Sequence, residues 1–118
     1  MSDSLADQLP DDGWRDAIGA INRCALLGVD WDGHGADAPN PKILDSAHEL
    51  LVFLYMQNWS PPCRVVPTQE GGLLVEWQTA DRYLEAEFVG NGRVEWMAKA
   101  GELPAIHLVS SLPLEALR

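Results

Sequence analysis

The chain of 118 residues has the length of one domain, and its hydrophobic and charged fractions, 47% and 22%, are typical of a globular protein rather than a disordered one. Eighteen acidic residues against eight basic ones give a net charge of −10, which argues against direct binding to nucleic acid, because phosphates require a basic surface. The same charge suits association with a basic protein, or serves solubility alone.

The ends of the sequence and its two cysteines indicate the compartment. Residues 1–10 predict a flexible acidic leader, and residues 11–118 a single domain. The leader lacks the basic region and apolar core of a signal peptide, and no apolar run reaches the length of a membrane span. Cys24 and Cys63 have no metal-binding or redox spacing, so we expect free thiols. Together these features predict a cytoplasmic protein that does not bind a membrane.

A first helix is predicted to start near residue 13. Asp11 or Asp12 is the expected N-cap, and Gly28 is the expected C-terminal stop. Apolar residues that recur at helical spacing would face the core: Trp14, Ala17, Ile18, Ile21 and Ala25.

A second helix follows a loop of about a dozen residues. Asn40 is the expected N-cap, and Pro41 occupies the first helical position, where a missing amide costs nothing. The helix should end near Trp59, because the following prolines cannot continue it. Its apolar face would carry Ile43, Leu44, Ala47, Leu50, Leu51 and Leu54.

The second half of the chain alternates apolar and polar residues with a period of two. Three half-buried antiparallel strands are predicted at 72–79, 83–89 and 93–99, preceded by an edge strand, Cys63–Pro67. The segment 105–109 would add a fifth strand, and 112–118 a last helical turn. The fold class is therefore α+β, with two N-terminal helices packed on one face of a four-stranded or five-stranded antiparallel meander sheet.

Whether a connecting loop has an odd or an even number of residues sets the expected register of the sheet. Trp96 shares a face with Phe88 only if the intervening loop has an odd number of residues, which places Phe88 opposite Val94. The preceding connection then pairs Trp77 with Leu84. The sheet would thus have one apolar face and one polar face, and the polar face would carry Glu76, Glu85, Glu87 and Glu95.

The loop "VDWDGHGADAPNPK" (residues 29–42) is the most unusual stretch. Asp30, Asp32 and Asp37 resemble the acids of a calcium loop, but His34 and Pro41 fall at positions where that loop needs oxygen ligands. We favour a packing corner, in which Trp31 folds back between the helices and the sheet, glycines supply positive φ angles, and Asp32 accepts backbone hydrogen bonds. A partner-binding loop and a metal site are the alternatives.

No residue pattern indicates catalysis or a cofactor. The chain has no nucleophilic serine motif, and Cys24 lies on a predicted helix face, where a cysteine packs rather than reacts. His34, His48 and His107 are too far apart in sequence to form a known zinc motif. The strand glutamates could perform acid–base chemistry, but a solvated face is the simpler interpretation. We therefore expect no enzymatic activity, no cofactor and no bound metal.

Two motifs resemble a group of small bacterial proteins. "WDGHGA" (residues 31–36), followed by a proline-started helix and then "VVPTQEGGLLVEW" (residues 65–77), resembles the pattern W-D-G-x-G-A, helix, P-x-x-x-G-G-x-x-x-E-W, over about residues 14–97. The group is functionally uncharacterised and occurs in mobile or accessory genomic regions, so the resemblance implies a bacterial origin and no particular activity. The aromatic residue that the group usually has at the position of His34 is replaced here.

The functional hypothesis that follows is a small acidic binding protein without enzymatic activity. It would dock on a basic, nucleic-acid-handling protein, as an inhibitor, antitoxin or immunity protein does. The alternative is a homo-oligomeric accessory protein, for example a homodimer, that associates through a strand edge or through its C-terminal segment. The candidate partner-binding residues are Asp30, Trp31, Asp32, His34, Asp37, Glu76, Glu85, Glu87 and Glu95.

Overall fold

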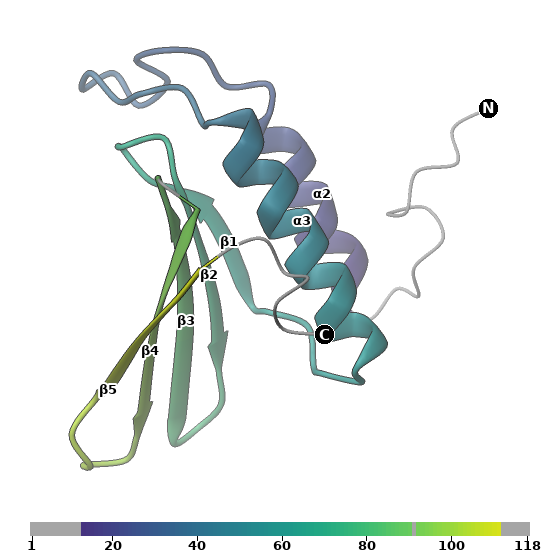
Figure 1. Cartoon of the computed structure of the whole chain (residues 1–118), viewed down its shortest axis with the longest axis vertical. Helices are drawn as coiled ribbons and strands as arrows, with labels where there is room; N and C mark the ends of the chain where they lie inside the picture. Colours follow the sequence, from purple (N-terminus) through teal and green to yellow (C-terminus); the bar gives the residue numbers. More distant parts are fainter. Residues whose placement is uncertain (1–12, 91, 112–118) are drawn as a thin grey trace.

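The computed structural model describes residues 13–90 and 92–111, in which two helices precede a five-stranded antiparallel sheet (Figure 1). Each strand pairs with the next one along the chain, in the order β1-β2-β3-β4-β5, and the helices contact one face of this meander. This confirms the predicted α+β architecture and the fifth strand. The elements are α2 (Trp14–Cys24), α3 (Pro41–Met56), β1 (Arg64–Pro67), β2 (Leu73–Gln78), β3 (Arg82–Val89), β4 (Arg93–Ala100) and β5 (Ile106–Ser111). The predicted leader and the predicted last helical turn lie outside the described residues.

Helix α2 differs from its prediction at both ends. Gly13 occupies the N-cap position with a φ of 103° and no side-chain cap, so the predicted aspartate cap is wrong. The helix ends at Cys24 rather than at Gly28, because the amides of Leu26 and Leu27 donate to carbonyls three residues back and tighten the last turn. Ala25 is therefore exposed, and Cys24 is buried in its place.

Helix α3 begins as predicted. The Asn40 side chain accepts a hydrogen bond from the Lys42 amide at 2.9 Å, and Pro41 is the first helical residue. The helix ends at Met56, three residues before the predicted end at Trp59. The predicted apolar face is buried, with Ile43 half-buried at its margin.

The predicted register of the sheet is confirmed. Phe88 pairs with Val94, and Trp77 pairs with Leu84. Alternate residues therefore point to the face that the helices cover, which we call the inner face, and the remaining residues point to the opposite, outer face. On the inner face, five side chains are 0–1% exposed: Leu73, Val75, Ala86, Phe88 and Val94.

The helices cover the inner face unevenly. Helix α2 lies against β1, and α3 contacts β2 and β3 (Figure 1). Towards β5 the inner face opens to solvent, since Trp96 and Ala98 are half-buried and Ile106 and Leu108 are 62% and 65% exposed. The sheet thus has a covered half and an uncovered half on its apolar side.

Candidate functional site

The loop between the helices is organised around the carboxylate of Asp32. Its Oδ1 atom accepts hydrogen bonds from the amides of His34 at 2.8 Å and Ala36 at 3.1 Å. Its Oδ2 atom accepts from the Gln69 side chain at 2.9 Å, which links the loop to the turn between β1 and β2. These bonds, first of all the one from the His34 amide, hold the pKa of Asp32 below its ordinary value.

Asp30 and Trp31 also serve the loop itself. Asp30 has a φ of 64°, and its carboxylate accepts from the Gly35 amide at 2.6 Å. Trp31 donates from Nε1 to the Asp37 carbonyl at 2.9 Å and does not belong to the hydrophobic core, so the predicted wedge between helices and sheet is wrong. The indole instead closes the loop by its bond to a carbonyl six residues further along the chain.

The remaining loop candidates face outward. His34 and Asp37 are exposed, although the Asp37 amide donates to the Gln69 carbonyl at 2.8 Å. Gly33 and Gly35 have the predicted positive φ angles, 75° and 82°. Between residues 13 and 111, leaving out residue 91, no group of three or more His, Cys, Asp or Glu side chains is placed to hold a metal ion.

Replacing Asp32 should loosen this corner. In Asp32→Ala the His34 and Ala36 amides lose their acceptor, so their hydrogen exchange should accelerate and the melting temperature should fall; Asp32→Asn, which keeps an acceptor oxygen, should change less. Because the folded pKa is depressed, the carboxylate stabilises the fold above its ordinary pKa of 3.8, and this stabilisation is lost as the pH falls through the lower folded value. Exchange rates measured by NMR test this. Unchanged protection of the two amides in Asp32→Ala would contradict the assigned bonds.

The outer face of the sheet brings the four predicted glutamates together. Glu76 lies directly opposite Glu85 across β2 and β3, and Glu87 lies directly opposite Glu95 across β3 and β4. All four side chains are half-buried. Like charges directly opposite each other destabilise a sheet, so the arrangement has an electrostatic cost.

Neighbouring groups offset part of this charge. Arg64 pairs with Glu76 at 3.0 Å, and Arg93 lies 3.6 Å from Glu95. The Tyr83 hydroxyl lies between Glu76 and Glu85, at 2.8 Å from Glu85, and its single proton can be donated to one of the two at a time. Burial and these carboxylates raise the pKa of Tyr83, which therefore stays a neutral donor.

Of the four glutamates, Glu85 and Glu87 have no cation partner among the described residues, and Glu85 at least accepts a hydrogen bond from Tyr83. Within the described part of the chain, no ion pair or hydrogen bond engages the carboxylate of Glu87. Partial burial, followed by the charges of Glu95, Glu85 and Glu70, raises the pKa of Glu87. We call Glu76, Glu85, Glu87 and Glu95 the acidic face. Its charge is incompletely balanced, and Glu87 is where the imbalance is greatest.

The two predicted groups of binding residues form two separate sites. The loop is tied by hydrogen bonds to Gln69 and Gly71 at one end of the sheet, whereas the acidic face spreads across β2, β3 and β4. The carboxylates of Asp30 and Asp32 already accept bonds from their own loop. The loop carboxylates are thus engaged within the protein, which makes the acidic face the better candidate for contact with another molecule.

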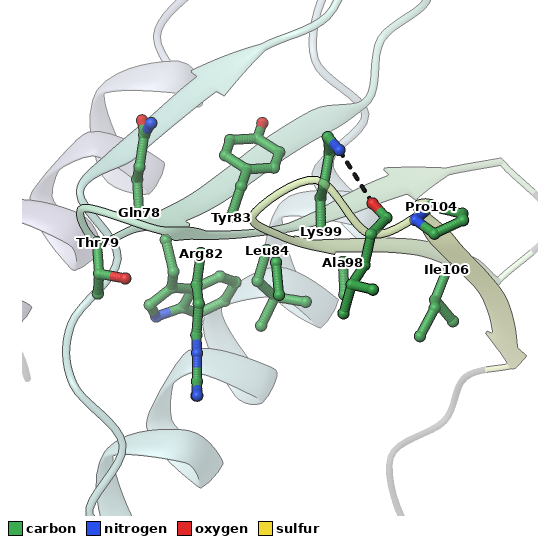
Figure 2. A pocket seen from close by; sticks show the side chains of 12 residues that line it. Gln78, Thr79, Arg82, Tyr83, Leu84, Ala98, Lys99, Pro104 and Ile106 are labelled. Carbon is green, nitrogen blue, oxygen red and sulfur yellow. Dashed lines mark hydrogen bonds between the residues drawn. The ribbon is translucent and has the colours of Figure 1, made fainter.

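The uncovered half of the inner face contains a trough, made of two hollows, that the sequence pattern did not predict. A hollow of about 350 Å³ lies over the ends of β3 and β4, with Arg82, Leu84, Ala98 and Ile106 pointing into it and Tyr83 on the opposite side of the sheet (Figure 2). A neighbouring hollow of about 440 Å³ extends to α3. The alternation of residues indicated which face is apolar, but not how far two helices would cover it.

Three tryptophans form a row beside this trough. Trp77 packs edge-on against Trp59 at 5.8 Å and stacks on Trp96 at 6.5 Å between ring centroids. Two of the indole nitrogens have partners, since Trp77 donates to the Ser60 carbonyl and Trp96 to the Ser110 hydroxyl. The row therefore extends the core towards β5 without closing it.

Comparison with protein-family models, curated proteins and solved structures finds no significant match to this chain. The resemblance of the two motifs to a bacterial protein group stays a prediction. Within the part of the chain that the structure describes, neither helix is long and apolar enough to cross a membrane.

Proposed function

We propose that this protein is an acidic binding protein without enzymatic activity, and that its acidic face docks on a basic surface of another protein. The biological role that fits is that of an inhibitor, antitoxin or immunity protein acting on a nucleic-acid-handling partner. We expect it to act in the cytoplasm and not to bind nucleic acid directly, since a net charge of −10 repels phosphates.

The observation that carries this proposal is that no cation among the described residues pairs with the carboxylate of Glu87. Glu87 faces Glu95 across the strands, and its pKa is raised, so the ionised side chain is held at a cost to the folded protein. Features that break a local rule of stability are expected at functional sites, where binding offsets the cost. A basic partner would supply the missing cations.

The shape of the surface supports the same proposal. The acidic face lies on three adjacent strands of a continuous sheet, which makes a broad surface suited to another protein rather than a pocket for a small molecule. Charge complementarity across such a surface mainly accelerates association and selects the partner.

The test compares capture of host proteins by three tagged forms of the full chain at low salt. The first is the wild type, and the second carries Glu85→Lys, Glu87→Lys and Glu95→Lys. The third is a control with the same change of charge at exposed sites elsewhere, Asp45→Lys, Asp81→Lys and Glu102→Lys. The proposal predicts that a basic protein binds the wild type and the control in a fixed ratio, elutes as salt is raised, and is lost from the acidic-face variant. Equal capture by all three forms, or capture of no basic protein by the wild type, would contradict it.

A further inference from the structure

The two edge strands of the sheet, β1 and β5, differ in length, sequence and contacts. Strand β1 is four residues long, contains Pro67 and a terminal arginine, Arg64, and packs against α2. Short length, proline and charge are the devices that keep an edge strand from pairing with another chain. Strand β5, Ile106–Ser111, has six residues and contains no Pro, Asp, Glu, Lys or Arg. The described part of the chain provides it with a neighbour on one side alone, β4.

Strand β5 exposes apolar side chains on both faces of the sheet. Ile106 and Leu108 point to the inner face, and Val109, opposite Glu95, points to the outer face; each is 62–65% exposed. A molecule that packed on one face of the sheet would leave the other side of the strand in water. A strand added alongside β5 would cover both sides at once and would also pair the backbone groups on the side of β5 that faces away from β4.

The distribution of charge favours a second copy of this chain as that strand. Two molecules of net charge −10 repel each other, so a contact between copies must avoid the acids. Residues 103–111 contain no Asp, Glu, Lys or Arg, and they include strand β5. In antiparallel pairing about a two-fold axis, each copy contributes the same strand, β5. The assembly is therefore complete with two copies.

We propose that the protein forms a homodimer by antiparallel pairing of β5 with β5 of a second copy, producing one continuous sheet of two meanders. The two-fold axis is perpendicular to the sheet, so both acidic faces lie on the same side of the dimer. For the proposed function this would present two binding surfaces to a partner and increase avidity. That consequence depends on the proposed function, whereas the dimer does not.

The test is the mass of the full chain in solution over a series of concentrations, by light scattering or sedimentation equilibrium. The wild type is expected at twice 13.0 kDa. Val109→Lys should be a folded monomer, since the new lysine faces Glu95 within its own chain but charges the edge that the partner would cover. Leu26→Lys, an equal change at a side chain 85% exposed beyond α2, should remain a dimer.

Circular dichroism and the melting temperature of each variant show whether it folds, and Leu108→Lys provides a second disruption of the same edge from the inner face. A wild type that stays monomeric at every concentration, or that grows beyond two copies, would overturn the proposal. So would lysine variants of β5 that fold and keep twice the monomer mass. None of these measurements includes a binding partner, so the dimer and the proposed function can fail independently.

Discussion

Replacing Gly72 by alanine is expected to lower the free energy of unfolding by about 3 kcal/mol, the upper range for forcing an extra group into a packed site. A Cβ atom at Gly72 would lie 2.4 Å from the Phe88 carbonyl oxygen and 3.0 Å from the Thr68 hydroxyl. The carbonyl cannot move aside, because Phe88 pairs with Leu73 in the adjacent strand and its side chain is fully buried. The added methyl group must therefore push β2 and β3 apart.

Gly28→Ala is the matched control, because no atom lies within 4 Å of a Cβ at that position and its backbone has no positive φ. We expect it to change stability by less than about 1 kcal/mol, in either direction. Urea unfolding followed by circular dichroism measures both variants. A Gly72→Ala protein as stable as the wild type would mean that β2 and β3 do not approach as closely as described.

The reversal of charge at Glu85, Glu87 and Glu95 is expected to have the largest effect on binding. Six units of charge change on one face, so a basic partner that was attracted is repelled, and we expect the association rate to fall by more than about tenfold. The loss should be greatest at low salt, because ions screen charges over about 10 Å at an ionic strength of 0.1 M. The rate of association with the captured partner, measured against salt concentration, tests this.

The control variant at Asp45, Asp81 and Glu102 has the same net charge as the acidic-face variant. A difference between the two variants therefore reports the position of the changed charges and not the net charge. It should retain most of the wild-type rate and a similar salt dependence. If both variants lose the same amount, long-range repulsion explains the result, and the acidic face is not the contact surface.

Much of the fold could be predicted because apolar residues recur at helical or strand spacing, and because the number of residues in a connection decides which side chains share a face. The alternation in the second half placed Phe88 opposite Val94 and Trp77 opposite Leu84, since a slip of one residue would have turned every apolar side chain outward. The helix ends were less predictable. Gly28 is a good helix terminator, yet α2 stops at Cys24 because its last turn tightens first, and no residue type signals that in advance.

The loop between the helices shows where local reasoning succeeds and where it fails. Asp32 and the two glycines play the expected roles, because those roles depend on neighbours in the sequence. The link from Asp32 to Gln69 spans 37 positions and depends on how the helices meet the sheet, so it could not be foreseen. The position of Trp31 was predicted wrongly for the same reason.

The resembling motifs have a structural explanation in this chain. In "WDGHGA" the aspartate accepts backbone bonds, the glycines take positive φ angles, and Ala36 is 2% exposed. In the glycine pair, Gly71 has a φ of 82° beside the Ala38 carbonyl, and Gly72 leaves room for β3. The motifs therefore fix how the loop meets the β1–β2 turn. The two motifs thus have a structural role in this chain.

The central claim is that the acidic face is kept for binding at a cost to the free protein, and the stability of Glu87→Gln tests it most directly. With its pKa raised, Glu87 does not destabilise the fold at low pH, where it is protonated in both states; the penalty develops as the pH rises from the ordinary value of 4.5 through the higher folded value. Glu102→Gln, at an exposed position in the turn after β4, controls for net charge.

We predict that Glu87→Gln is more stable than the wild type at pH 7 by about 0.5 kcal/mol, the size of a repulsive cross-strand pair. The difference should shrink as the pH falls towards 4.5, and Glu102→Gln should show a smaller gain that does not depend on this pair. A Glu87→Gln protein that is no more stable than Glu102→Gln at pH 7 would contradict the account, because the acidic face would then carry no cost that binding needs to offset.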